Sequence, residues 1–201
     1  MSGRFYKFVH LVLSPLITLL FLKKAEGTEN LPEEGGYVLC ANHLSACDPV
    51  FLASRLPHRH RIAIIAKKEL FDIKLLKPLI VALGAFPVDR GQADIAAIRT
   101  SMQVLKEGKA LMIFPQGTRS KDNTPTPMLP GASMIALRAN VPVIPAYIDG
   151  PYRLFQRKRV CFGAPIDFSD FGRRCDKDTL EKATERIADA VWSMQKECRK
   201  G

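Results

Sequence analysis

Short apolar segments of strand length alternate with helical segments along most of the chain, and this alternation constrains the fold more than any other feature. The predicted strands are 37–41, 61–66, 86–88, 110–114, 141–147 and 160–162, and the predicted helices are 49–55, 69–83, 94–107, 133–139 and the chain from 177 onward. Residues 110–114 (ALMIF) are continuously apolar, as expected for a strand covered on both faces. Pro142 and Pro145 favour a place at the sheet edge, or an irregular path, for 141–147. The pattern predicts an α/β fold with a mixed central sheet flanked by helices.

A second apolar segment, residues 8–22, lies near the N-terminus and has Lys or Arg on both sides. It is shorter than the roughly 20 residues that a straight helix needs to cross a bilayer. Positive charge at both ends suits a segment whose ends stay on one anionic face. We expect an interfacial or re-entrant helical anchor, with a buried core helix or a single short span as alternatives. The polar connector 26–36 then divides the chain into a membrane-anchoring segment, 1–25, and a globular domain, 26–201.

The chain is basic, with a formal net charge of +10. This charge favours nucleic acid, an anionic membrane surface or a phosphorylated substrate as partner. No helix-turn-helix, stacking platform or zinc signature supports nucleic acid, and no GxGxxG or P-loop supports a nucleotide fold. The five cysteines are odd in number and include no CxxC, which argues against a disulfide framework and a thiolate metal site. We therefore expect a reducing compartment that faces the cytosol.

The run 37–49 leaves the first predicted strand and enters a polar elbow that contains His43 and Asp48. Residues five apart in a helix are roughly 140° apart around the axis, so this pair can meet only across a turn. A carboxylate on one imidazole nitrogen would fix the tautomer and leave the other nitrogen free as a base. Alternatively, Asp48 is an ordinary helix N-cap before Pro49, and His43 is a structural histidine. The pair alone leaves both interpretations open.

Basic side chains follow three of the predicted strands. They are Arg119 after 110–114, Arg90 after 86–88 and Lys67 after 61–66. Gly117 and Thr118 precede Arg119 in a loop that could present backbone N–H groups and a guanidinium to one anion. Each of these sites is also compatible with a surface turn or a solvated charge.

Four blocks in order, 42–48 (NHLSACD), 84–90 (GAFPVDR), 114–120 (FPQGTRS) and 141–145 (VPVIP), resemble the motifs of the glycerolipid acyltransferase family, specifically its 1-acylglycerol-3-phosphate acyltransferases. The resemblance covers about residues 26–170. It implies transfer of a fatty acyl group from acyl-CoA or acyl-ACP to the free hydroxyl of lysophosphatidic acid, giving phosphatidic acid. It implies no metal and no cofactor beyond the acyl thioester. It also implies that His43 is the general base and Asp48 its orienting partner. The residues implied at the substrate phosphate are Arg119, Gly117, Thr118, Arg90 and Lys67.

One position departs from the family's pattern, since Gln116 stands where the third block usually has glutamate. Glutamine keeps the size and the hydrogen bonding but loses the charge, so we expect activity to survive, with the acceptor preference in question. Backbone N–H groups near the elbow are expected to stabilise the oxyanion. Cys47 could be an acyl-accepting nucleophile, although a small buried apolar residue is the favoured role.

The expected partners are lysophosphatidic acid, an acyl thioester, a membrane surface and acyl carrier protein, at the cytoplasmic face of a bacterial cell membrane. The alternatives are another lysophospholipid or glycerol 3-phosphate as acceptor, or a non-catalytic membrane lipid-binding homologue. A metal-dependent hydrolase using the elbow with His58 and His60 is disfavoured by the arginines around those two histidines. The apolar stretch 70–83 either lines an acyl-chain groove, rests on the membrane or packs in the core.

Overall fold

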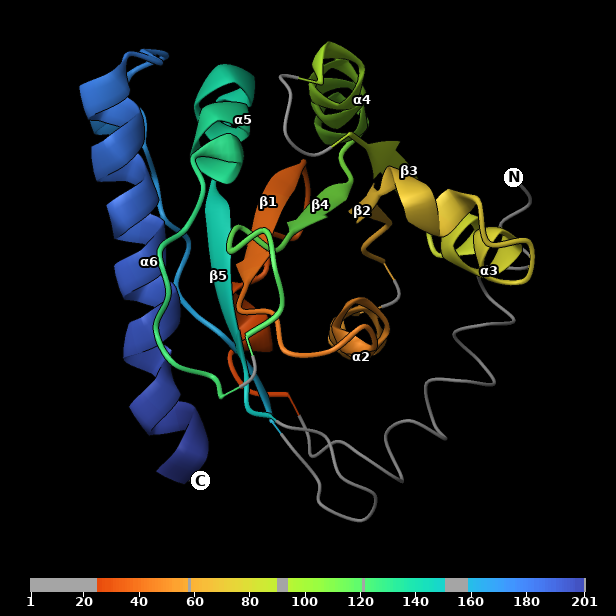
Figure 1. The fold of residues 1–201 in the computed structure, drawn as a ribbon. Coiled ribbons are helices and arrows are strands. Elements are labelled where there is room, and N and C mark those ends of the chain that lie inside the picture. Colours follow the sequence, from red (N-terminus) through yellow and green to blue (C-terminus); the bar gives the residue numbers. More distant parts are fainter. Residues whose placement is uncertain (1–24, 58, 90–93, 121, 151–158, 201) are drawn as a thin grey trace.

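The computed structural model describes residues 25–57, 59–89, 94–120, 122–150 and 159–200, which form a sheet with helices on both faces (Figure 1). The strands are β1 (Tyr37–Ala41), β2 (Ile62–Lys67), β3 (Ala85–Val88), β4 (Ala110–Ile113), β5 (Val143–Ile148) and β6 (Val160–Phe162). The helices are α2 (Asp48–Arg55), α3 (Leu76–Ala82), α4 (Ile95–Lys106), α5 (Gly131–Ala139) and α6 (Lys177–Lys200), with 3-10 turns η1 (Thr28–Asn30), η2 (Lys68–Phe71) and η3 (Ser169–Phe171).

The strand order is β3-β2-β4-β1-β5-β6, and every pairing is parallel except that of β5 with β6. Successive residues of β1 alternate between two cores: Val38 and Cys40 pack with α4, α5 and α6, whereas Leu39 and Ala41 pack with α2. Figure 1 shows α4, α5 and α6 on one face and α2 on the other. The predicted α/β architecture with a mixed sheet is therefore confirmed, and its fully covered strands explain the continuous apolar runs.

The prediction that Pro142 and Pro145 place their strand at the sheet edge or on an irregular path is wrong. β5 is a regular, buried strand between β1 and β6. The carbonyl of Pro145 accepts the N–H of Gly163 at 2.8 Å, on the side of β6. Since the nitrogen and oxygen of one strand residue point to the same side, the N–H that proline lacks would also face β6. The missing N–H therefore lies just beyond the end of β6, which ends at Phe162. The ladder between β5 and β1, on the other side, loses no hydrogen bond.

The predicted continuous helix over 69–83 is also wrong, because the structure has the short turn η2 and then α3 with a break between them. Pro78 cannot donate a hydrogen bond to the carbonyl of Lys74, and its ring would clash with that carbonyl in a continuous helix. As the third residue of α3, Pro78 occupies a position where the N–H has no intrahelical acceptor. The proline therefore determines where the helix begins.

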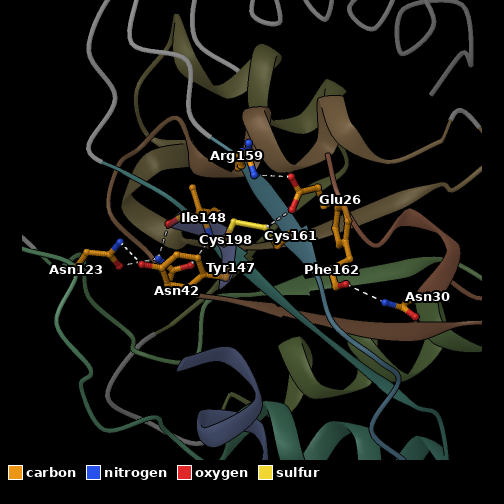
Figure 2. Close-up of a disulfide and its surroundings, with 10 residues drawn as sticks. All are labelled: Glu26, Asn30, Asn42, Asn123, Tyr147, Ile148, Arg159, Cys161, Phe162 and Cys198. Carbon is orange, nitrogen blue, oxygen red and sulfur yellow. Dashed lines mark hydrogen bonds and ion pairs between the residues drawn. A yellow bond between two sulfur atoms is a disulfide. The ribbon is translucent and has the colours of Figure 1, made fainter. Parts of the chain in front are cut away.

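Cys161 and Cys198 form a disulfide between β6 and the end of α6, with Cα atoms 6.1 Å apart (Figure 2). The cysteine count and spacing argued against a disulfide framework, and that inference is wrong for these two residues. They are 37 residues apart in sequence. They meet because the predicted apolar stripe of α6, which includes Ala183, Ile187 and Val191, is buried against the sheet.

The predicted anchor, residues 1–25, lies almost entirely outside the described residues. In the parts of the chain that are described, no helix is long and apolar enough to cross a membrane. The connector begins in contact with the sheet: the N–H of Glu26 donates to the carbonyl of Val160, and its carbonyl accepts the N–H of Phe162. The chain is therefore tied to the edge strand from Glu26 onward.

Candidate active site

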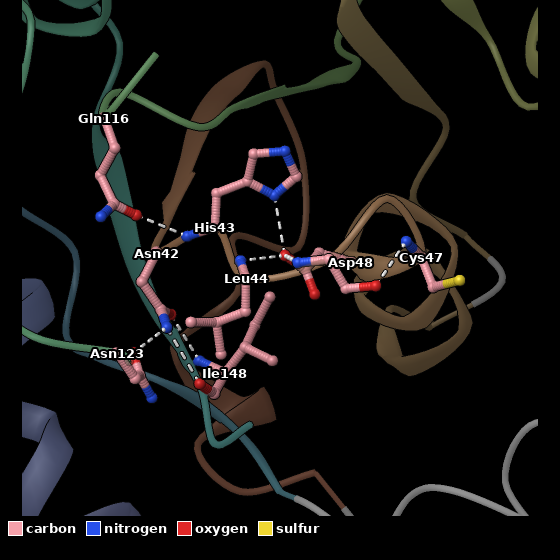
Figure 3. Close-up of polar contacts among 9 residues, drawn as sticks. Asn42, His43, Leu44, Cys47, Asp48, Gln116, Asn123 and Ile148 are labelled. Carbon is pink, nitrogen blue, oxygen red and sulfur yellow. Dashed lines mark hydrogen bonds and ion pairs between the residues drawn. The ribbon is translucent and has the colours of Figure 1, made fainter. Parts of the chain in front are cut away.

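His43 and Asp48 meet in the elbow after β1, as the sequence predicts. Nδ1 of His43 lies 2.7 Å from Oδ2 of Asp48 (Figure 3). The loop that joins them turns tightly, and the N–H of Asp48 donates to the carbonyl of Ser45 at 3.1 Å. Because a carboxylate only accepts hydrogen bonds, Nδ1 is the donor, which in a neutral imidazole leaves the lone pair on Nε2.

Asp48 is fully buried and is the first residue of α2. Its Oδ2 accepts three hydrogen bonds, from His43 and from the backbone N–H groups of Leu44 at 2.6 Å and Ser45 at 2.8 Å. The alternative role of Asp48 as helix N-cap is wrong, since Cys47 occupies that position and Oδ2 faces the elbow. Three donors on one oxygen hold the carboxylate in a single orientation toward the imidazole.

The imidazole of His43 is held from its flat side as well. The ring of Phe114, the residue after β4, stacks on it with centroids 4.3 Å apart and an interplanar angle of 25°. The side chain of His43 remains 14% exposed, and Nε2 points away from Asp48 (Figure 3). The reactive nitrogen is therefore accessible while the ring cannot tilt freely. Nothing in the sequence pointed to this role of Phe114.

Gln116, the departure from the family's third block, binds the backbone of the elbow. Its Oε1 accepts the N–H of His43 at 2.6 Å, and its Nε2 donates to the hydroxyl of Thr126. The next loop residues continue this contact, because the N–H of Ser120 donates to the carbonyl of His43 at 2.8 Å. The third block therefore fixes both backbone polar groups of His43.

Asn42 directly follows β1 and fixes the direction of the chain as it enters the elbow. It is fully buried, and its side chain exchanges two hydrogen bonds with the backbone of Ile148: Oδ1 accepts the N–H at 2.7 Å, and Nδ2 donates to the carbonyl at 3.0 Å (Figure 3). Nδ2 also donates to Oδ1 of Asn123 at 2.9 Å. The side chain thus replaces one step of the ladder with β5. Asparagine next to the predicted base was the available signal, but its long-range partners are not visible in the sequence.

The predicted phosphate-binding residues do not all lie at the elbow. Gly117 (φ 72°), Thr118 and Arg119 form the loop after β4, with Arg119 exposed beside the Ser120 contact to the elbow. Lys67 ends β2, separated from β1 by β4, and its Nζ pairs with Glu69 at 2.8 Å. Arg90 lies outside the described residues. The structure therefore brings the Arg119 loop to the elbow, whereas Lys67 is engaged elsewhere.

Backbone N–H groups near the elbow were expected to stabilise the oxyanion. This expectation is wrong for four of them, because each already donates to an acceptor within the protein. Those of His43, Leu44 and Ser45 bind Gln116 or Asp48, and that of Cys47 donates to the hydroxyl of Ser45 at 3.2 Å.

The expectation of a buried Cys47 is wrong too, since its side chain is exposed and points away from the imidazole (Figure 3). A cysteine nucleophile attacking beside His43 has no support in this geometry.

His60 does not join the elbow in a metal site. His60 precedes β2, and its Nδ1 lies 3.1 Å from the hydroxyl of Tyr37. Tyr37 is the first residue of β1, so His60 lies at the amino end of that strand, whereas His43 follows its carboxyl end. Burial, assisted by the charge of Arg59, lowers the pKa of His60, and this favours the neutral imidazole. His58, the other predicted ligand, lies outside the described residues.

Comparisons with known proteins find acyltransferases. The chain matches the family model described as Acyltransferase over residues 23–149. It is 32% identical to the 1-acyl-sn-glycerol-3-phosphate acyltransferase of Bacillus subtilis (strain 168), over 94% of this chain and 96% of that protein. It is also 32% identical to the protein of that name from Streptococcus pneumoniae, over 86% of this chain and 66% of the relative.

A solved structure is similar as well. The crystal structure of the 1-acyl-sn-glycerophosphate (LPA) acyltransferase PlsC from Thermotoga maritima superimposes with a TM-score of 0.74 at 27% identity, covering 98% of this chain and 80% of that one. The family model spans more than half of the chain and includes the elbow and the Gln116 loop. The chain therefore belongs to the acyltransferase family.

Proposed function

We propose that this acyltransferase transfers a fatty acyl group to the free hydroxyl of a 1-acylglycerol 3-phosphate and so forms phosphatidic acid. The observation that carries the proposal is the His43–Asp48 pair, an oriented base with no protein nucleophile bonded to it among the described residues. The names of the relatives support the lipid acceptor. The nucleophile is then the hydroxyl of the substrate.

In the proposed reaction, Nε2 of His43 removes the proton of the acceptor hydroxyl while that oxygen attacks the thioester carbonyl. The acceptor oxygen bonds to the acyl carbon, the carbon–sulfur bond breaks, and the proton passes from the imidazolium of His43 to the thiolate, which leaves as a thiol. Asp48 stabilises the imidazolium that forms transiently, because its Oδ2 already accepts the Nδ1 proton. No covalent intermediate with the protein is required.

The acceptor phosphate is proposed to bind at the loop of Gly117, Thr118 and Arg119. A guanidinium holds two phosphate oxygens at once, and the positive φ of Gly117 turns the loop sharply after β4. A Cβ at Gly117 would lie 2.8 Å from a methyl of Leu129, an exposed side chain that can move aside, so the positive φ and not the packing favours glycine here. Arg90 and Lys67 are proposed as further phosphate contacts, and Lys67 would first have to leave Glu69.

The acyl donor is proposed to be acyl-CoA or acyl-ACP, with no other cofactor. We further propose that residues 1–25 anchor the domain 26–201 at the cytoplasmic face of a bacterial cell membrane. The apolar run 8–22 and its flanking positive charges support this placement.

The test is acyl transfer to labelled lysophosphatidic acid by the full chain. His43→Ala should lower kcat by about 10²–10⁴-fold, the usual contribution of a general base. Cys47→Ala is the matched control and should keep near-normal turnover, because its thiol is exposed and faces away. Normal turnover of His43→Ala with loss in Cys47→Ala would refute the mechanism.

A second variant addresses the phosphate. Arg119→Ala should raise the KM for lysophosphatidic acid by about 10–100-fold, as expected for a lost charge-assisted contact, and leave the KM for the acyl donor nearly unchanged. Equal effects on both substrates would contradict the role of Arg119 at the acceptor phosphate.

A further inference from the structure

Exposed large apolar side chains gather in one short segment of this protein. Within the described residues, the segment 70–79 holds Leu70, Ile73, Leu75 and Leu79, which are 37%, 50%, 91% and 38% exposed. We call these four side chains the 70–79 surface. They lie on η2, on the break after it and on α3, where Ala82 is the only buried residue of the helix. Apolar side chains gathered in this way on a folded domain indicate an interaction site.

The 70–79 surface and the candidate active site both lie where the parallel strands have their carboxyl ends. We call this end of the sheet the active-site edge. η2 begins directly after Lys67, the last residue of β2, and Nζ of Lys68 is 3.8 Å from the carboxylate of Asp89, just after β3. β2, β3, β4 and β1 are parallel, so their carboxyl ends share one edge, and His43 follows β1 there. The two other exposed large apolar residues of the described chain, Ile95 and Leu129, are in connections that leave this edge too.

Positive charge accompanies the apolar side chains. Lys74 and Lys77 are exposed and form no ion pair with any described residue, whereas Lys67 and Lys68 have acidic partners. Long lysine stems can lie along apolar surface while their ammonium groups reach lipid phosphates. Leucine or isoleucine beside unpaired lysine is typical of a segment that lies in the interface of an anionic bilayer.

The surface of α6, which lies beside β5 on the opposite side of the molecule from α3, differs from the 70–79 surface (Figure 1). Its outer face is charged, with the ion pairs Lys182–Asp178 and Arg186–Asp170, and it has no exposed large apolar side chain among its described residues. Among the described residues, the exposed large apolar side chains are therefore all at the active-site edge.

We propose that the 70–79 surface is a membrane-docking surface that inserts Ile73 and Leu75 between the lipids of an anionic bilayer. This inference rests on the proposed function in one respect: a lipid acceptor stays in the bilayer, so its hydroxyl reaches His43 only if this edge lies at the interface. The surface belongs to the globular domain and acts in addition to any N-terminal anchor. It sets the orientation of the active site relative to the lipid plane.

Fluorescence of the full chain tests the insertion locally. Leu75→Trp is made in a Trp192→Phe background and bound to phosphatidylglycerol vesicles with brominated acyl chains, which quench only a tryptophan that enters the lipid. The matched control is Glu185→Trp, an exposed position on α6. If Trp192→Phe prevents folding, the native Trp192 is retained and its signal, measured in wild type, is subtracted.

We expect strong quenching at position 75 and none at position 185, with cosedimentation showing that both variants are bound. An unquenched position 75 in vesicle-bound protein would overturn the proposal. Emission already shifted to the blue without vesicles would overturn it too, because another part of the chain or a second copy would then cover the surface. This readout needs no turnover, so it is independent of the proposed reaction.

Turnover supplies the second readout. Ile73→Asp combined with Leu75→Asp should lower acylation of lysophosphatidic acid embedded in vesicles by about tenfold, since two apolar side chains no longer enter the lipid. Acylation of a short-chain, monomeric acceptor should stay within about twofold of wild type. Ile95→Asp, an exposed isoleucine outside the 70–79 surface, is the matched control and should affect neither rate.

An equal loss on both acceptors would overturn the proposal and assign these side chains to substrate binding. An equal vesicle-specific loss in Ile95→Asp would overturn it as well, since added negative charge at this edge would then explain the effect. A protein that is quenched at position 75 but acylates no acceptor would keep the docking surface and refute the proposed function.

Discussion

The backbone N–H of His43 donates to the side-chain oxygen of Gln116 at 2.6 Å. The third sequence block therefore acts on the base through its backbone, and a hydrogen-bond acceptor at position 116 is what this contact requires. A carboxylate and an amide both supply one. The geometry explains how glutamine can stand where the family usually has glutamate.

Gln116→Glu should retain turnover within about threefold, because the carboxylate accepts from His43 and the hydroxyl of Thr126 can turn to donate. Gln116→Ala should lower kcat by about 10–100-fold, since the elbow loses the contact that positions the imidazole. Steady-state kinetics of both variants, with circular dichroism to confirm folding, provide the measurement. A folded but inactive Gln116→Glu enzyme would contradict this account.

Asp48→Asn separates charge from geometry. Its amide oxygen can accept the same three hydrogen bonds, while its NH₂ group takes the place of Oδ1, which has no hydrogen-bond partner among the described residues. The imidazolium then loses the charge that stabilises it, so kcat should fall by about 10³–10⁴-fold with little change in the KM for the acceptor. Stopped reactions with labelled acceptor measure the residual rate. A loss below about tenfold would mean that the carboxylate only orients the ring.

Asn42→Asp should destabilise the fold even though it exchanges a single heavy atom. The new carboxylate oxygen would face the carbonyl of Ile148 and Oδ1 of Asn123, which now accept from Nδ2. Leaving such buried groups without a donor costs about 1–3 kcal/mol each. Urea denaturation at neutral pH measures the free energy of unfolding. The control is Asn140→Asp at the exposed end of α5, where we expect a much smaller change.

Periodicity and apolar runs were sufficient to predict nearly every strand and helix, because β1, β4, β5 and β6 are buried throughout and therefore apolar along their whole length. The pairing of His43 with Asp48 was also predictable, since both lie in one short turn. The partners of Asn42 were not, because they come from residues about 80 and 106 positions away. Pro145 misled the prediction for β5, since a proline is harmless where the neighbouring strand ends. Such features depend on register, which composition does not encode.

Stability should rise with pH around the unperturbed pKa of histidine because of His60. Burial lowers the pKa of His60 in the folded protein. Below about pH 6.5, the unfolded chain therefore binds a proton at His60 more readily than the folded chain does. The unfolded state then holds more protons, and stability is lost as the pH falls through this window. Melting temperatures between pH 5 and 7.5 should show the slope. His60→Gln keeps an acceptor for the hydroxyl of Tyr37 and should flatten it; an unchanged slope would assign the effect to other groups.

The disulfide between Cys161 and Cys198 should stabilise the fold by closing a long loop. With the two cysteines 37 positions apart in the sequence, the chain-entropy argument gives about 3–4 kcal/mol. Reduction, or Cys198→Ser, should lower the melting temperature, whereas Cys175→Ser should not, because Cys175 is a free thiol. Mass spectrometry after alkylation in denaturant without reductant should find three modified cysteines and two protected ones. Five modified cysteines in purified protein would show that the bond does not form, and the melting temperature should then be insensitive to reductant.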